Sequence, residues 1–254
     1  MEYFVSEKSI VREIWGKGDT ILFIFAGASA EFALNKAVDR LYFTGRLPAD
    51  PLGRLFSTVA YARQIVFSRK EDALRTIDKM RVIHAEVEKA RGSVIPDWAY
   101  RDVLFMLIDY SIRSYELLER KLTLAEKTEV FETFYQVGFR MGIAGLPPTF
   151  SDWERLREDH LHHDLEKSRF TADLYRQYRK HLGIIRYFVL RQAQIMVVPE
   201  RVKHLLLLRN VSVLMPLLSL YKFSRNLNLE WLIKSLLLPP AYKSEIKALD
   251  SRLA

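Results

Sequence analysis

Residues 71–91, EDALRTIDKMRVIHAEVEKAR, are typical of an amphipathic α-helix. Their apolar side chains recur at spacings of three and four, the repeat that places residues on one face of a helix. This inward-facing stripe consists of Ala73, Ile77, Met80, His84 and Val87, whereas Lys79, Arg81, Glu86 and Lys89 lie on the charged face. The stripe therefore places one histidine, His84, among apolar residues.

The position of His84 allows two interpretations. Burying an imidazole without a hydrogen-bond partner is costly, so the side chain needs one. From periodicity alone, the ordinary interpretation is a core histidine bonded to a backbone carbonyl or to a neighbouring hydroxyl. The alternative is iron ligation, because a neutral imidazole at the wall of an apolar pocket is the usual proximal ligand of a haem. The helix by itself favours the first interpretation.

The rest of the chain also predicts helices, so we expect an all-α fold. The expected helices cover residues 18–42, 51–67, 70–91, 97–121, 124–142, 151–168, 171–196, 200–209, 211–224 and 229–238. Capping boxes of the form Ser/Thr-x-x-Glu open three of these runs, at Ser68–Glu71, Thr123–Glu126 and Ser151–Glu154. No stretch alternates as a strand would. Because no Gly/Ser-rich or Pro-rich linker divides the chain, residues 1–254 are expected to form one domain.

Composition excludes several classes of site and partner. The chain has no cysteine, which rules out disulfides, thiolate catalysis and cysteine-bound iron–sulfur, zinc or haem centres. Its formal net charge is +8, but no basic tract is interleaved with aromatic residues, so nucleic-acid binding is not expected. The start does not resemble a signal peptide, and the apolar runs at 211–220 and 229–238 are shorter than the roughly 20 residues of a spanning helix. We expect a cytoplasmic protein with peripheral membrane contact through its C-terminal region.

Two further helices carry residues suited to a ligand. On residues 51–67, Arg54, Thr58 and Tyr61 share a face at i, i+4 and i+7. If this face borders a cavity, the guanidinium could bind a carboxylate and the hydroxyl could position bound oxygen. A surface Arg–Asp pair is the common alternative. Residues 26–30, AGASA, are all small, which suits the close approach of another helix or of a flat ligand equally well.

Taken in order, these segments resemble a haem-dependent oxygenase family that includes latex-clearing protein (rubber oxygenase) and an oxygenase of the mycophenolic acid pathway. The matching residues are Trp15, Gly16, Gly18 and Asp19; Asp50, Pro51, Leu52, Gly53, Arg54 and Thr58; Arg81, His84, Ala85 and Val87; Asp102, Leu104 and Tyr115; Leu122, Thr123 and Glu126; and Gly142, Leu146 and Pro147. The resemblance implies a globin-like helical core at about 15–150, followed by a helical extension at 151–254.

The resemblance also implies a cofactor, a reaction and the residues that serve them. His84 matches the histidine that binds the iron of haem b, and Arg54 and Arg81 would be further cofactor-binding residues. Arg54 and Thr58 match polar residues near the haem and are the implied catalytic residues. The implied reaction is the dioxygen-dependent cleavage of a C=C bond in an apolar, isoprenoid-like small molecule. From periodicity, the apolar residues expected to line the pocket include Phe25, Phe56 and Met106.

The sequence departs from the family pattern at three places. A lysine of the family's Arg-x-x-Lys-Thr segment is Ser57 here, and the His-Pro of many relatives is Gly27-Ala28. The carboxylate proposed as catalytic base has no secure match, and Glu31 and Asp39 are the nearby candidates. These departures motivate a second hypothesis, a helical haem- or lipid-binding protein that performs no turnover.

A competing metal hypothesis concerns residues 158–166, EDHLHHDLE. His160 and Asp164 are four residues apart, as are Glu158 and His162. Di-iron helical bundles, however, use Glu-x-x-His on two helices, and no second copy is evident. The tract is more typical of a charged, solvated helix face. The sequence also lacks the Gly-x-Ser-x-Gly, GxxxxGK[ST] and GxGxxG motifs of hydrolases and nucleotide-binding proteins.

Overall fold

The computed structural model describes residues 2–38, 42 and 50–218, apart from the side chains of residues 51, 54 and 55. The helices that lie wholly within this part of the chain are α1 (Ile10–Trp15), α2 (Gly18–Phe32), α5 (Pro51–Phe67), α6 (Lys70–Arg91), α7 (Asp97–Leu118), α8 (Leu124–Met141), α9 (Phe150–His163), α10 (Arg169–Val197) and α11 (Glu200–Leu205). Extended backbone pairs there only at two isolated bridges, Tyr3↔Arg69 and Asn35↔Leu165. The all-α prediction is confirmed.

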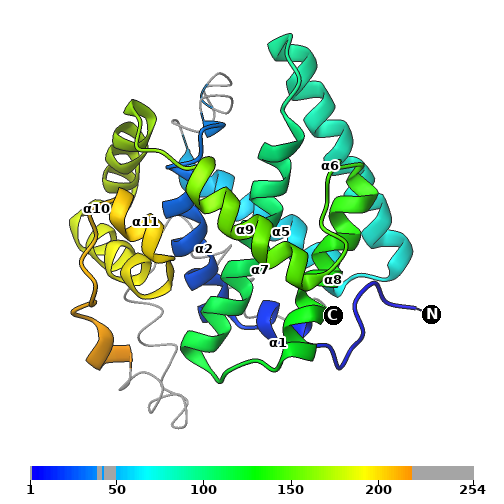
Figure 1. The fold of residues 1–254 in the computed structure, drawn as a ribbon, viewed down its shortest axis with the longest axis horizontal. Helices are drawn as coiled ribbons and strands as arrows, with labels where there is room; N and C mark the ends of the chain where they lie inside the picture. The colour runs from blue at the N-terminus through cyan, green and yellow to red at the C-terminus, as the bar shows by residue number, and fades with distance from the viewer. Residues whose placement is uncertain (1, 39–41, 43–49, 219–254) are drawn as a thin grey trace.

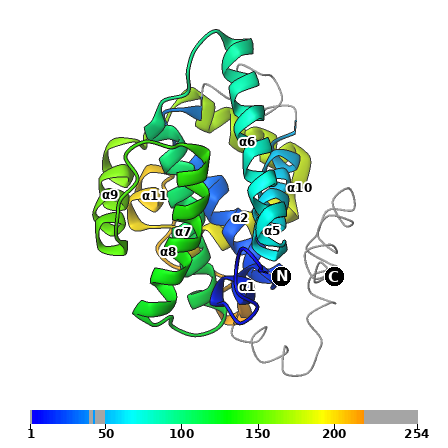
Figure 2. The ribbon, with the colours of Figure 1, turned by 90° about the vertical axis from the view of Figure 1, so that its right-hand side faces the viewer.

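Helix α2 runs through the middle of the fold and packs most extensively on α7 and then on α10 (Figure 1). Figure 2 shows α2 between α7, α8 and α9 on one side and α5, α6 and α10 on the other. The small residues of α2 were predicted to let another helix approach closely, and α7 does so at Gly27. A Cβ atom at this position would lie 2.2 Å from the ring of Tyr110 on α7. The next residue, Ala28, lines a cavity instead. The close approach of another helix is therefore confirmed at Gly27, and the approach of a flat ligand stays a prediction at Ala28.

One of the three predicted capping boxes is confirmed, and two are wrong. The Thr123 side chain accepts from the backbone N–H of Glu126, whose carboxylate accepts in return from Thr123. Ser68 instead ends α5, and its carbonyl accepts from Phe4 of the N-terminal segment, so α6 begins without a side-chain cap. At α9 the capping residue is Thr149, two positions before the serine that the pattern indicated.

The expected helix at 18–42 ends at Phe32 because the chain beyond it pairs with the end of α9. The carbonyl of Leu34 accepts from Glu166 N–H, and Lys36 N–H donates to the carbonyl of Asp164. These bonds interrupt the helix with turns at residues 33–37, on either side of the bridge between Asn35 and Leu165. Helix α1 was not predicted. The expected helix at 229–238 and the end of the one at 211–224 lie outside the described residues.

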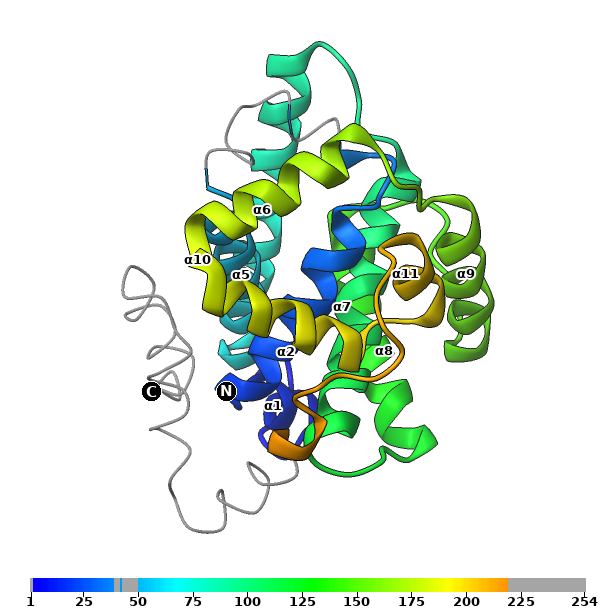
Figure 3. The same ribbon diagram turned by 90° about the vertical axis from the view of Figure 1, so that its left-hand side faces the viewer.

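Helix α10 crosses the outer side of α2 and bends at Gly183 (Figure 3). The backbone of this glycine has a φ of 71°, a left-handed value that residues with a Cβ atom seldom adopt. The prediction of one helix at 171–196 did not include this kink. None of the helices in the described part of the chain is long and apolar enough to cross a membrane.

Candidate active-site cavity

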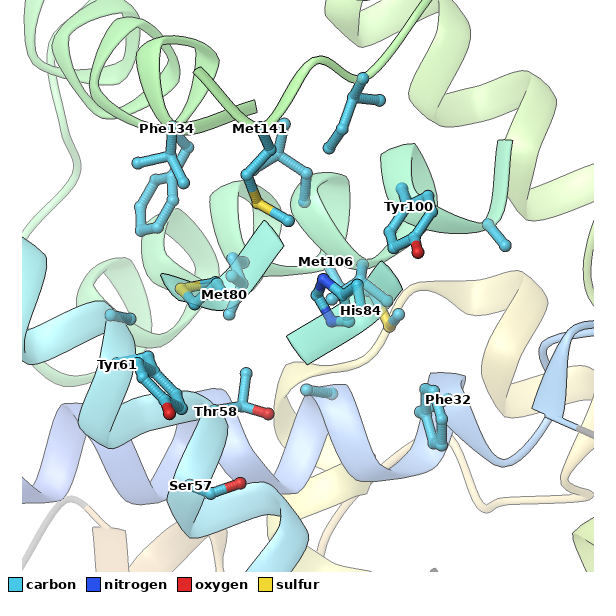
Figure 4. A pocket seen from close by; sticks show the side chains of 18 of the residues that line it. Phe32, Ser57, Thr58, Tyr61, Met80, His84, Tyr100, Met106, Phe134 and Met141 are labelled. Atoms are coloured by element: carbon cyan, nitrogen blue, oxygen red, sulfur yellow. The ribbon is translucent and has the colours of Figure 1, made fainter. Parts of the chain in front are cut away.

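A cavity of about 240 Å³ lies between α2, α5, α6, α7 and α8, with Tyr178 of α10 at its wall. Apolar side chains form most of the lining, including Phe32, Met80, Met106 and Phe134 (Figure 4). Among the residues that the structure describes, no aspartate, glutamate, lysine or arginine lines it. The cavity therefore suits an apolar molecule, which a few neutral polar groups would orient.

His84 lies in the wall that α6 contributes. The inward-facing stripe is confirmed, because Ala73 and Ile77 are fully buried while Met80, His84 and Val87 line the cavity. The half-buried imidazole meets the ring of another lining residue, Tyr100 of α7, edge to face. Their ring centroids are 5.2 Å apart at an interplanar angle of 60°. Apart from Asn35, His84 brings the only nitrogen-bearing side chain to the described lining.

The other predicted site residues are divided between the cavity and the surface. Thr58 lines the cavity from α5 together with Ser57, and Figure 4 shows their hydroxyls on the side of the cavity away from α7. Arg54 is in the first turn of α5, but its side chain lies outside the described part of the structure. Arg81 is exposed on α6 and is not a lining residue. The structure thus brings Thr58 and His84 to one cavity.

Of the three apolar residues expected to line the pocket, Met106 does so. Phe25 and Phe56 pack against each other instead, with ring centroids 4.8 Å apart, and border the main hydrophobic core. Neither is a lining residue. Helical periodicity identifies the inward face of a helix, but it does not show which inward residues meet empty space.

A buried ionic cluster, made of Glu31, Asp102, Asp109, Arg157 and His160, lies beside the cavity. The guanidinium of Arg157 binds both oxygens of Glu31, at 2.5 and 2.6 Å, and Oδ2 of Asp109 at 2.9 Å. The cluster thereby joins α9 to α2 and α7. Such a bidentate arrangement suits the planar guanidinium and fixes the relative position of the three helices.

His160 extends the cluster towards the cavity. Its Nε2 lies 2.8 Å from Oε1 of Glu31, and its Nδ1 lies 2.7 Å from Oδ1 of Asp102. The other oxygen of Asp102 accepts from the side-chain amide of Asn35 at 2.8 Å, and Asn35 lines the cavity. The hydroxyl of Tyr110 donates to Glu31 at 2.7 Å. A chain of polar contacts therefore runs from His160 of α9 through Asp102 to Asn35 at the cavity wall.

The protonation states of the cluster follow from these contacts. Burial would raise the pKa of Glu31, but Arg157 and His160 favour its charged form and hold the pKa well below its usual range. Burial opposes the charge of His160 as well, yet the bonds to Asp102 and Glu31 outweigh this effect and raise its pKa to about 9. At neutral pH, Glu31 is a carboxylate and His160 an imidazolium.

The cluster corrects the interpretation of residues 158–166 as a solvated face. His162 and His163 are exposed as expected, whereas His160 is 3% exposed. Ligand atoms of Asp102, His160 and Asp164 lie within 4.8 Å of one another, a spacing that could hold a metal ion. A metal needs a neutral imidazole, however, and here His160 is charged, with one ring N–H facing Glu31 and the other facing Asp102. We therefore interpret the arrangement as an ion-pair network rather than as a metal site.

Glu31, one of the two candidates for the catalytic base, belongs to the buried ionic cluster. Glu31 is fully buried, its carboxylate is bound by Arg157, His160 and Tyr110, and it does not line the cavity. A carboxylate held in this way is a weak base. The other candidate, Asp39, lies outside the described residues.

Comparison with known proteins identifies one family. A family model described as "ER-bound oxygenase mpaB/B'/Rubber oxygenase, catalytic domain" matches residues 15–232. This range includes every helix that lines the cavity and the whole buried ionic cluster. No curated protein and no solved structure matches the chain.

Proposed function

The chain belongs to the mpaB and rubber oxygenase family, and from this premise we propose a haem b-dependent oxygenase acting on an apolar, unsaturated, isoprenoid-like small molecule. Membership establishes an oxygenase catalytic domain. The haem, the substrate class and the oxidative cleavage of a C=C bond with dioxygen as co-substrate are our proposal. The observation that carries it is the placement of His84 in the wall of an apolar cavity.

The donor set of the cavity fits a b-type haem. A side chain that can bind iron and an apolar surrounding would suit such a haem, and His84 offers an imidazole among mainly apolar side chains. The volume of about 240 Å³ is slightly below the usual range of roughly 300–1,000 Å³ for small-molecule sites, so a macrocycle requires the cavity to widen. Helix α6 is suited to this movement, because none of residues 78–91 is fully buried.

The predicted site residues have proposed roles. His84 would hold the iron, and a bound haem would supply the activation of dioxygen. Thr58 brings a hydroxyl donor from α5, and the apolar lining excludes water and orients an apolar substrate. Arg54 and Arg81 remain proposed cofactor-binding residues, and Arg54 and Thr58 remain proposed catalytic residues. Guanidinium groups suit the haem propionates, which are carboxylates.

The visible spectrum of haem-reconstituted protein tests the proposal. We expect a Soret band in the wild type that is lost in His84→Ala. His162→Ala is the matched control, because His162 is an exposed histidine outside the cavity. The control should keep the band. A wild type without the band after reconstitution, or His84→Ala with an unchanged band, would refute haem ligation by His84.

A second candidate function is haem or lipid binding without turnover. Two observations favour it. Ser57 stands where the family has a lysine, and no described carboxylate lines the cavity to act as a base. Oxygen consumption with isoprenoid substrates separates the two functions. An enzyme consumes oxygen in a substrate-dependent manner, and this consumption should fall in Thr58→Val, whereas a carrier shows no consumption in either protein.

The proposal includes a cytoplasmic location with peripheral membrane contact. Exposed apolar side chains follow α11 in the described part of the C-terminal region, namely Leu207, Val211, Val213, Met215 and Leu217. Apolar side chains at a surface favour insertion into a lipid interface, and the net charge of +8 favours anionic lipids. Co-sedimentation with vesicles containing phosphatidylserine should exceed co-sedimentation with pure phosphatidylcholine vesicles. Equal recovery with both would argue against the contact.

A further inference from the structure

We propose that Tyr100 and Glu88 are positioning residues that set the orientation of the His84 imidazole. The expected effect of the two residues on cofactor binding rests on the proposed function. Their effect on the orientation of the His84 ring rests only on contacts within the protein. Tyr100 lies against His84, and Glu88 holds Tyr100 in place.

The contact between the two rings restricts rotation of the imidazole. The terminal torsion of a histidine side chain has broad intrinsic preferences, so its neighbours determine how the ring turns. The Tyr100 ring meets the imidazole edge to face, with centroids 5.2 Å apart at 60°. Aromatic rings favour this arrangement at separations of 4.5–7 Å. The tyrosine ring therefore selects one orientation of the imidazole at the cavity wall.

Glu88 fixes the tyrosine. Its Oε1 accepts from the hydroxyl of Tyr100 at 3.1 Å and from the backbone N–H of Ile95 at 2.8 Å. Glu88 also lies one helical turn after His84, so the two side chains share a face of α6. One carboxylate oxygen thus ties the start of α7 and the preceding loop to the turn of α6 that follows His84.

The bond between Tyr100 and Glu88 lies in the half of α6 where none of the residues is fully buried. Residues 78–91 are exposed or only partly buried, and α6 ends at Arg91, before Gly92, which has a left-handed φ of 72°. His84 is only partly buried, so burial alone leaves its ring less constrained than that of a fully buried residue. The bond from Tyr100 to Glu88 supplies a specific contact there. In metal sites generally, a group that orients a histidine ligand changes metal affinity when it is removed.

The first test uses the full chain without haem. Nuclear Overhauser effects between the ring protons of His84 and Tyr100 report the ring contact directly. We expect these effects to weaken in Glu88→Ala and to persist in Glu88→Gln, whose amide oxygen can still accept both bonds. Glu86→Ala is the matched control, because Glu86 is exposed on the same helix. Unchanged effects in Glu88→Ala would overturn the proposal whether or not haem binds.

The second test uses the haem-loaded protein. Electron paramagnetic resonance of the ferric state reports the orientation of an axial imidazole, which a purely structural role for Glu88 would leave unchanged. We expect altered g values and roughly 10-fold weaker haem affinity in Glu88→Ala and in Tyr100→Leu. Glu88→Gln and Glu86→Ala should resemble the wild type. Wild-type spectra and affinity in both disruptive variants would overturn the inference, whereas loss of all haem binding in the wild type would refute only the proposed function.

Discussion

Raising the pH from 6.5 to 9.5 should weaken the fold, because His160 loses the proton that it shares with the buried ionic cluster. Its folded-state pKa of about 9 exceeds the ordinary histidine value of 6.5. The stabilisation is therefore complete below pH 6.5 and is lost as the pH rises through 9. The separation of about 2.5 pH units, at 1.36 kcal/mol per unit, corresponds to about 3 kcal/mol of unfolding free energy.

The groups that face His160 make the assignment specific. Glu31 approaches from α2, Asp102 from α7, and Arg157 and Asp164 from α9 and its end. Carboxylates titrate below this pH range and arginine above it, so the histidine is the member of the cluster that changes charge within the range. Deprotonation would leave Asp102 and Glu31 with one positive partner fewer in a region that excludes water.

Urea unfolding followed by circular dichroism, at several pH values from 6.5 to 9.5, measures the effect. The wild type and His162→Gln, which changes an exposed histidine, should lose about 3 kcal/mol across the range. His160→Gln should lose much less. An equal loss in all three proteins would refute the reasoning. If His160→Gln does not fold, the pKa of His160 measured by NMR in the wild type decides, and an ordinary value near 6.5 would contradict the prediction.

Three further outcomes are expected. Arg157→Met should lower the unfolding free energy by about 3–5 kcal/mol, because it leaves buried carboxylates unpaired, and urea unfolding should show much less change for the exposed Arg155→Met. Gly27→Ala should cost about 1–3 kcal/mol, since its methyl group overlaps the Tyr110 ring, and an unchanged melting temperature would count against this close packing. Haem at about 100 times its Kd should stabilise the wild type by roughly 2.7 kcal/mol in thermal melts. The same shift in His84→Ala would mean that haem binds without this ligand.

The part of the site that depends on local periodicity could be predicted from the sequence. The inward direction of His84 could be predicted because every residue of the apolar stripe lies on one helix, α6. The same reasoning predicted that Phe25 and Phe56 line the pocket, and this was wrong, because the two rings pack against each other instead. Which inward residues border a cavity depends on how several helices pack, and a single helical pattern does not contain that information.

The buried ionic cluster could not be predicted, because its partners are far apart in the chain. Arg157 and Glu31 are separated by 126 positions. Viewed locally, residues 158–166 have the composition of a solvated helix face, and only the carboxylates of α2 and α7 make burial of His160 tolerable. The early end of α2 has a similar cause, since Leu34 pairs with Glu166.

The role of Asn35 has a consequence for ligand selection. Asn35 borders the cavity, where one N–H of its amide donates to Asp102 and its amide oxygen accepts from the backbone N–H of Ala37. A ligand that competed for the bond to Asp102 would deprive a buried carboxylate of a donor, at a cost of about 1–3 kcal/mol or more. A ligand that competes for the bond between Asn35 and Asp102 is therefore disfavoured at this side of the cavity. An apolar ligand leaves that bond intact.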